Sequence, residues 1–337
     1  MSENLQIRLA ARPEGLPKAS DFNATHDAKP EPADGEMLVR LIYLSLDPAM
    51  RGWMTDRKSY IEPIQLGDVM RGLALGEVTE SKVDGFEPGD LVSGALGWRQ
   101  WAVTTPKEVQ KLPKGMPLPL FLGPLGMTGL TAYFGLLDIG APKAGETVVV
   151  SAAAGAVGSV VGQIAKIVGC RTVGIAGGPE KCRQLTEEFG FDEAVDYKAG
   201  DIGKALYKAC PDGIDVYFDN VGGEILDAAL ALLNQGARIP ICGAISQYNA
   251  TEPVPGPYNY LSILINRARM EGFIVFDFMK RYPEALEKPG AWVAEGKIQG
   301  RYDIVQGLEN APEALLRLFD GRNTGKLIVQ IGDEPAA

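Results

Sequence analysis

The chain has 337 residues, of which 46% are hydrophobic and 23% are charged, a composition typical of folded globular proteins and unlike disordered or fibrous ones. Its 33 basic and 43 acidic residues give a net charge of −10, which would repel nucleic-acid phosphates and anionic membrane surfaces. We therefore expect no nucleic-acid partner and no membrane partner. At roughly 150 residues per domain, the length predicts two domains.

The start of the sequence shows no export signal. Residues 1–13 carry no apolar run behind basic residues, and no uninterrupted run of about 18 apolar residues occurs in the chain. The cysteines form no C-x-x-C pair and are expected to be reduced, structural thiols; they are Cys170, Cys182, Cys210 and Cys242. These features predict a soluble, cytoplasmic protein.

The residue inventory also limits the chemistry. His26 is the single histidine, and its polar surroundings at 23–27 predict an exposed turn. A Ser–His or Cys–His mechanism therefore has one weak candidate, and no G-x-S-x-G motif accompanies it. The cysteine spacing does not fit a zinc site. We expect no metal.

The first half of the chain reads as a mainly β domain. Between Gly35 and Leu112, short apolar runs alternate with glycine and proline. The expected strands are Met37–Leu46, Arg71–Val78 and Trp98–Val103, with a turn at 87–90 before the last of them. The breaker-rich segment 112–119 then separates the two halves.

The second half repeats an apolar strand, a glycine and an amphipathic helix, which predicts a parallel α/β sheet. Expected strands are Thr147–Ser151, Arg171–Ala176, Ala194–Tyr197, Ile214–Asp219, Ala237–Cys242 and Met270–Phe276. Expected helices are Ala156–Val168, Pro179–Phe189, Ile202–Ala209 and Glu224–Leu233. Six such strands fit a doubly wound sheet. The tail, a helix at Asn310–Phe319 and a strand at Lys326–Ile331, is expected to pack back on the first domain.

The turn between the first strand and the first helix of this half fits a dinucleotide fingerprint. In the segment 151–162, Ala153 takes the first glycine position of G-x-G-x-x-G, and Gly155 and Gly158 take the second and third. Gly155 would let the backbone approach a pyrophosphate, and Gly158 would let the helix pack on the strand. Ala156 and Val157 lie between these glycines and are counted among the cofactor-binding residues.

The end of the second strand favours NADPH over NADH. The carboxylate that would bind a free ribose 2′-hydroxyl is missing there, and small residues run through to Gly178. Lys181 follows in the first turn of the next helix, where it would face a 2′-phosphate; the alternative is an ordinary solvated lysine.

Several segments together resemble a known family. They are Ala152–Cys170, the sequence FDNVGG at 218–223, Gly325-Lys326, Leu44–Pro48, Met50–Gly52, Ile245–Asn249 and the stretch from Tyr258 to Gly272. Over nearly the whole chain, the sequence resembles the zinc-independent medium-chain reductases of the leukotriene B4 dehydrogenase, prostaglandin reductase and alkenal double-bond reductase group. It looks most like the bacterial curcumin reductase branch.

This resemblance implies a fold, a cofactor and a reaction. The fold would be a Rossmann doubly wound parallel sheet at 124–298 with a GroES-like, mainly β domain at 1–123 plus 299–337. The enzyme would be a homodimer that uses NADPH to reduce the C=C bond of a small-molecule enone substrate, that is, an α,β-unsaturated ketone or aldehyde. The 2′-phosphate would be held by Lys181, Tyr197 and Asn323, and Asn220 of the FDNVGG sequence would contact the cofactor.

The catalytic candidates are hydroxyl groups. Hydride addition to an enone β-carbon places negative charge on the carbonyl oxygen, and a chain without a metal would stabilise it with tyrosine or cofactor hydroxyls. Tyrosines of the branch match Tyr60 and Tyr248, whereas Ala49 replaces a third. Two alternatives remain open: a quinone reductase of the same fold, and a non-catalytic NADPH-binding sensor.

Overall fold

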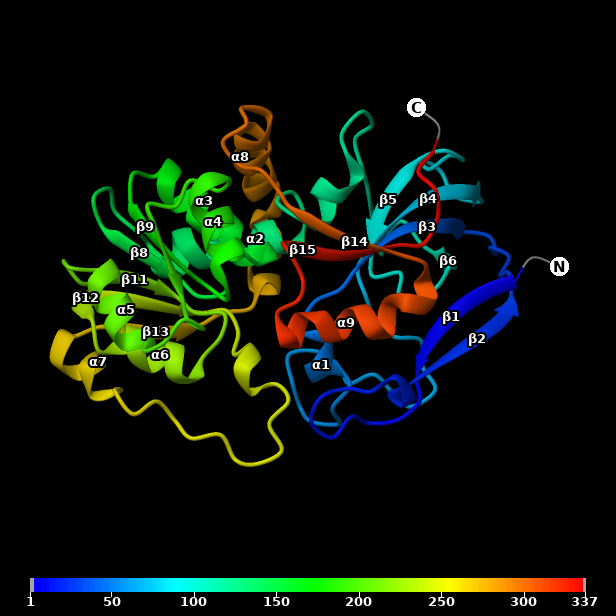
Figure 1. The fold of residues 1–337 in the computed structure, drawn as a ribbon. Helices are drawn as coiled ribbons and strands as arrows, with labels where there is room; N and C mark the ends of the chain where they lie inside the picture. Colours follow the sequence, from blue (N-terminus) through cyan, green and yellow to red (C-terminus); the bar gives the residue numbers. More distant parts are fainter. Residues whose placement is uncertain (1–2, 336–337) are drawn as a thin grey trace. The chain divides into compact units, whose positions relative to one another are not determined.

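The computed structural model describes residues 3–335 and divides into two compact units. The first unit comprises the described residues up to Leu122 and those from Tyr302 onward. The second unit is Gly123–Arg301, drawn in green to orange in Figure 1. The chain therefore leaves the first unit once and returns to it at the C-terminal end.

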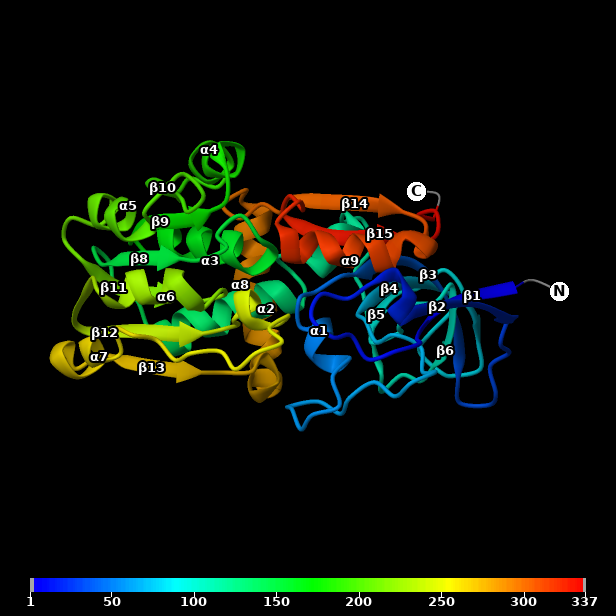
Figure 2. The ribbon, with the colours of Figure 1, turned by 60° about the horizontal axis from the view of Figure 1, so that its bottom comes forward.

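The second unit is built on a six-stranded parallel sheet. Its strands are β8 (Thr147–Val150), β9 (Arg171–Ala176), β10 (Glu193–Asp196), β11 (Ile214–Phe218), β12 (Leu233–Ile241) and β13 (Arg269–Gly272). They lie side by side in the order β10-β9-β8-β11-β12-β13, and all neighbours are parallel (Figure 2). This is the strand order of a Rossmann doubly wound sheet, so the predicted fold class is confirmed.

Helices cover both faces of this sheet, as Figure 1 shows. They are α2 (Met127–Phe134), α3 (Ala156–Ile167), α4 (Pro179–Glu187), α5 (Ile202–Ala209), α6 (Gly223–Leu230), α7 (Leu261–Asn266) and α8 (Tyr282–Ala294). Val148 and Val150 of β8 pack with α2, α3, α4 and α8, whereas Val149 packs with α5 and α6 on the other face. All three valines are fully buried, so the strand is apolar throughout rather than alternating.

The first unit is mainly β. Its strands are β1 (Glu3–Leu9), β2 (Phe22–Ala28), β3 (Met37–Ser45), β4 (Ala74–Ser81), β5 (Leu91–Gly94), β6 (Trp101–Thr104), β7 (Val109–Lys111), β14 (Tyr302–Gln306) and β15 (Lys326–Gln330). Its α-helices are α1 (Met50–Trp53) and α9 (Ala311–Asp320). The long strand β3 pairs with β4, β6 and β15, and all its residues except Arg40 are buried, which explains its nearly continuous apolar run.

The C-terminal tail completes this first unit. β15 pairs antiparallel with β3, and β14 adds to β15 in parallel. Lys326, at the start of β15, is almost fully buried and donates to Leu46 O at 2.8 Å and to Asp47 Oδ1 at 2.7 Å. The expectation that the tail packs back on the first domain is confirmed.

Two local expectations are wrong. The strand expected at Met270–Phe276 ends at Gly272, because Phe273 turns into the core against Phe218, with ring centroids 6.2 Å apart. A 3-10 helix, Val275–Arg281, follows. His26 is exposed as expected, but it lies on β2 rather than in a turn, because β2 pairs with β1 along its whole length.

Candidate cofactor site

The strand order places a site at one edge of the second unit. From β8 the chain continues through α3 to β9, and from β11 it continues through α6 to β12 on the opposite side. The connections therefore diverge at the carboxyl ends of β8 and β11. In open parallel sheets, such a switch point leaves a crevice where ligands bind.

The turn from β8 into α3 has the geometry of a phosphate cradle. Ala152 adopts a left-handed conformation with a φ of 48°, and its carbonyl accepts the Gly155 N–H at 2.9 Å. An ideal Cβ on Gly158 would lie 2.4 Å from Ala152 O and 2.8 Å from Ala153 Cα. No side chain fits there, so the close packing of α3 on the turn requires glycine at 158.

Gly155 lies in the same turn, at a position where few atoms surround it. It is the N-cap of α3, and an ideal Cβ on it would meet Ala152 O at 3.1 Å and no other atom within 4 Å beyond its chain neighbours. Gly155, Ala156 and Val157 are half-exposed, whereas Gly158 is buried. The first turn of α3 thus presents accessible backbone N–H groups and the positive end of the helix dipole, which suit an anion.

A second cluster lies at the ends of β9 and β10. Gly178, with a φ of 94°, is the N-cap of α4, and Lys181 follows in the first turn of that helix. Tyr197 comes directly after β10, and its ring lies against Gly177, where an ideal Cβ would be 2.9 Å from Tyr197 Cε1. The structure therefore brings Gly178, Lys181 and Tyr197 to one end of the sheet.

Asp196 organises this cluster, and the sequence analysis missed it. Its Oδ1 accepts the N–H groups of Gly178 at 2.8 Å and of Lys198 at 2.9 Å. The Asp196 carboxylate, at the end of β10, therefore links the glycine turn after β9 to β10. A polar residue directly after the apolar strand core was the available signal.

The third part of the site follows β11. Asn220 Nδ2 donates to Ser151 O at 2.7 Å, and the Asn220 N–H donates to Ser151 Oγ at 2.8 Å. Tyr248 lies nearby, because its Oη accepts the Ala244 N–H at 3.2 Å while Asn220 O accepts the Ile245 N–H at 3.2 Å. Asn220 and Tyr248 thus belong to one hydrogen-bonded loop cluster.

The remaining predicted residues belong to the first unit. Tyr60 is 50% exposed, and its Oη accepts the Trp53 Nε1–H at 3.2 Å. Asn323 lies in the turn between α9 and β15, where its Nδ2 donates to Gly325 O at 3.0 Å. Ala49 precedes α1. The structure therefore groups the second-unit candidates around the switch point and gives Tyr60 and Asn323 local partners of their own.

The thiols are poor candidates for catalysis. Cys170, Cys182, Cys210 and Cys242 form no disulfide with one another. Burial raises the pKa of Cys170 and of Cys210 to about 11, and that of Cys242 to about 12, so these groups stay protonated near neutral pH. Because the thiolate is the nucleophile, this chemistry is disfavoured.

Residues 3–335 contain neither a group of side chains suited to a metal ion nor a helix suited to span a membrane. Within that range, no three His, Cys, Asp or Glu side chains are grouped so that they could hold a metal ion. No helix in the described part of the chain is long and apolar enough to cross a membrane.

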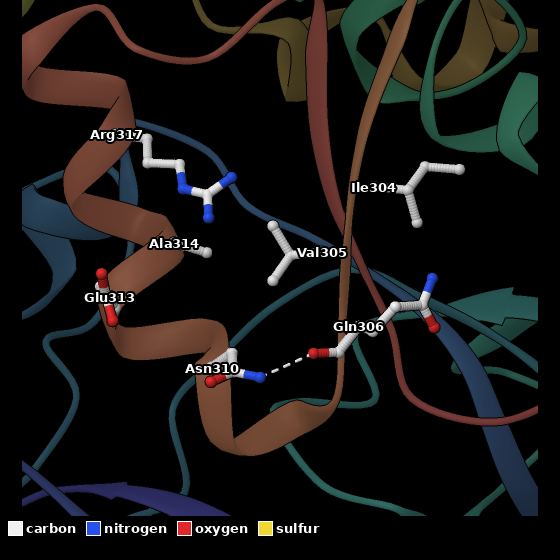
Figure 3. A pocket seen from close by; sticks show the side chains of 7 residues that line it. All are labelled: Ile304, Val305, Gln306, Asn310, Glu313, Ala314 and Arg317. Atoms are coloured by element: carbon white, nitrogen blue, oxygen red, sulfur yellow. Dashed lines mark hydrogen bonds between the residues drawn. The ribbon is translucent and has the colours of Figure 1, made fainter.

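A groove on the first unit lies apart from the predicted residues. It has a volume of about 420 Å³ and runs between β14 and α9. Its lining residues are Ile304, Val305, Gln306, Asn310, Glu313, Ala314 and Arg317 (Figure 3). Asn310 Nδ2 donates to Gln306 O at 2.8 Å at one end. No predicted site residue is among those that line this groove.

A parallel sheet of this order with a glycine cradle at its switch point defines a dinucleotide-binding protein. Residues 5–112 match the family described as the N-terminal domain of oxidoreductase, and residues 156–289 match the family described as zinc-binding dehydrogenase. The chain belongs to the medium-chain dehydrogenase/reductase family, among its NADP-dependent reductases of C=C bonds.

The relatives are similar over nearly their full lengths. The NADPH-dependent curcumin reductase of Escherichia coli (strain K12) is 47% identical over 333 residues, which are 97% of this chain and 96% of that protein. The NADP-dependent 2-alkenal reductase of Nicotiana tabacum is 44% identical over 98% of both chains. The crystal structure of CurA from Vibrio vulnificus in complex with NADPH is 50% identical, has a TM-score of 0.94, and covers 98% of this chain and all of that one (100%).

Proposed function

We propose that this protein reduces the C=C bond of α,β-unsaturated ketones or aldehydes with NADPH. The observation that carries the proposal is the cradle at the switch point, in which Gly158 leaves no room for a Cβ and an ideal Cβ on Gly155 would meet only Ala152 O. The double-bond reductases among the relatives, which are NADP-dependent, support the same reaction class.

The residues present fit NADPH. The N–H groups of Ala156 and Val157 would hold the pyrophosphate at the start of α3, and Gly155, which has no Cβ, would let it approach the backbone. Gly178 leaves space at the end of β9, and Lys181, Tyr197 and Asn323 would hold the 2′-phosphate. Asn220 would contact the cofactor near the switch point. When bound, NADPH supplies the hydride that the reaction consumes.

The tyrosines would act on the substrate. As negative charge develops on the carbonyl oxygen, a hydroxyl aimed at it stabilises the enolate, and protonation at the α-carbon completes the reduction. The Ala244 N–H donates to Tyr248 Oη and holds this hydroxyl in place, which supports the proposed role of Tyr248. The Trp53 Nε1–H donates to Tyr60 Oη and orients this hydroxyl in the same way, which supports the proposed role of Tyr60.

The two units would divide this work. We assign residues 124–298 to dinucleotide binding, and 1–123 plus 299–337 to the GroES-like substrate domain. We expect the reaction to need no zinc, since the protein supplies tyrosine hydroxyls instead. We propose that the protein is cytoplasmic, because the cytosol keeps thiols such as these four reduced.

A homodimer is also part of the proposal. β13 is the last strand of the six-stranded sheet and keeps one edge unpaired within it. The neighbouring helix α7 exposes apolar side chains, with Leu261 at 55%, Leu264 at 74% and Ile265 at 67% exposure. A second copy of the chain would cover this surface.

A substrate panel tests the function against its alternatives. NADPH consumption is measured with an enone, with a quinone and with no acceptor, and products are identified by mass spectrometry. The proposal expects fast turnover only with the enone and a product two hydrogens heavier. Turnover restricted to the quinone supports the quinone reductase instead, and tight NADPH binding without turnover supports the sensor.

A further inference from the structure

Asp219 is a fully buried carboxylic acid directly after β11. Its Oδ1 accepts hydrogen bonds from Ser151 Oγ at 3.1 Å and Tyr217 Oη at 3.0 Å. The same oxygen accepts the N–H groups of Val221 at 3.0 Å and Gly222 at 2.9 Å. One oxygen atom therefore gathers donors from the end of β8, from β11 and from the loop that leads into α6.

The backbone of Asp219 extends the same connection to the next strand. Its N–H donates to Pro240 O at 2.9 Å, and its carbonyl accepts the N–H groups of Cys242 at 2.9 Å and Gly243 at 3.1 Å. These contacts lie at the end of β12, just before Tyr248. Asp219 thus joins the carboxyl ends of β8, β11 and β12.

This arrangement has a cost. Desolvation raises the pKa of Asp219, and its hydrogen-bond donors only partly oppose that effect. The second oxygen, Oδ2, has no hydrogen-bond partner among residues 3–335, and none of the donors to Oδ1 is a charged side chain. An apolar residue would avoid this cost, so the carboxyl must contribute something that packing alone does not.

Oδ1 fixes the shape of two loops, the turn after β8 and the loop after β11. It holds the hydroxyl of Ser151, and that hydroxyl in turn accepts the Asn220 N–H. It also orders the loop amides up to Gly222, the N-cap of α6. Without this acceptor, the turn after β8 and the loop after β11 would lose the oxygen that both of them bind and would keep the direct hydrogen bonds between Ser151 and Asn220.

We infer that Asp219 is a positioning residue, which sets the relative placement of the Ser151 turn and the Asn220–Gly222 loop for NADPH binding. This inference rests on the proposed function. Asp219 acts through those loops and needs an acceptor oxygen rather than a charge.

The experiment compares Asp219→Ala with Asp219→Asn, which keeps an acceptor oxygen at the Oδ1 position. Asp215→Ala is the control, because Asp215 lies at the other end of β11 and accepts the Thr147 N–H at 2.8 Å. The Kd for NADPH is measured by calorimetry, and amide hydrogen exchange is measured on the protein without cofactor. Wild-type binding of NADPH is established first, since its absence overturns the proposed function itself.

Asp219→Ala is expected to weaken NADPH binding at least about tenfold and to speed exchange at the Val221 and Gly222 amides. Asp219→Asn should stay within about threefold of wild type in Kd and keep those amides protected. Asp215→Ala should lower Tm but leave the Kd unchanged.

Wild-type Kd in a folded Asp219→Ala variant overturns the inference, and so does equal weakening by Asp215→Ala. If Asp219→Ala does not fold, Ser151→Ala decides the matter. It removes one donor to Oδ1 and the acceptor of the Asn220 N–H, so NADPH binding should weaken several-fold, and an unchanged Kd contradicts the inference.

Discussion

Cofactor choice is decided at the scale of single residues. Lys181 stands at the third position of α4, beside a turn of small residues where an NAD enzyme would carry a carboxylate. A lysine at that point would add a charge-assisted hydrogen bond between two opposite charges to a 2′-phosphate, and only a weaker one to a neutral 2′-hydroxyl.

Lys181→Ala should therefore lower the ratio of kcat/KM for NADPH over NADH by roughly tenfold or more, since a hydrogen bond to a charged group contributes about 1.5–3 kcal/mol. Steady-state kinetics with both cofactors measures this ratio. Lys204→Ala is the matched control, because Lys204 holds the same third position in α5. A wild type with equal kcat/KM for both cofactors contradicts the assignment.

The two tyrosines of the proposed mechanism give a second prediction at this scale. Tyr248→Phe and Tyr60→Phe should each lower kcat for an enone, by about 100-fold where the lost hydroxyl is the main oxyanion donor. NADPH affinity should stay nearly unchanged, because only the transition state loses an interaction. Stopped-flow and binding measurements separate the two effects.

Tyr207→Phe is the control for these variants, since Tyr207 is 68% exposed on α5. Wild-type rates in both the Tyr248→Phe and the Tyr60→Phe variant, with small and bulky enones, would leave the donor role to another group. Ala49→Tyr should change the range of accepted substrates more than it changes cofactor affinity.

At the scale of elements, two substitutions in the first turn of α3 should separate an effect on folding stability from an effect on NADPH binding. Gly158→Ala would force a Cβ to within 2.4 Å of Ala152 O, so we expect unfolding to become easier by about 1–3 kcal/mol even without cofactor. Gly155→Val should keep the fold and weaken NADPH binding severely. Thermal unfolding and calorimetry on both variants test this contrast, and a Gly155→Val variant with wild-type Kd would place the phosphates elsewhere.

The elements also show what sequence reasoning can reach. β9 and α5 match their expected ranges residue for residue, because an apolar run and a capped amphipathic helix are local patterns. β2 was not expected, because its polar sequence acquires strand structure only by pairing with β1. The end of β13 was misjudged, because the packing of Phe273 against Phe218 is a tertiary contact.

The candidate site also contains residues that a local motif predicts and residues whose role depends on tertiary contacts. Gly155 and Gly158 belong to a motif with fixed spacing, and the structure places them in one turn. The organising roles of Asp196 and Asp219 are not evident in the sequence, because each carboxylate also accepts a hydrogen bond from a residue that follows a different strand, Gly178 for Asp196 and Ser151 for Asp219. Long-range hydrogen bonds of this kind leave no periodic pattern in a single sequence.

At the scale of the whole molecule, the exposed face of α7 predicts association. Leu264→Glu should convert a homodimer into a monomer, because a charge would replace an apolar side chain in the interface core. Sedimentation equilibrium measures the mass. The control is Leu66→Glu, which changes an exposed leucine of the first unit and should leave the dimer intact. A monomeric wild type, or a dimeric Leu264→Glu variant, would exclude this surface.

The reaction itself is tested most directly by following the hydride. NADPH carrying deuterium at the transferred position is incubated with the protein and an enone, and the product is examined by deuterium NMR. Our account predicts a saturated ketone with one deuterium on the former β-carbon, and no deuterium on the carbonyl carbon. Deuterium on the carbonyl carbon of an allylic alcohol, or no transfer to the enone at all, would contradict it.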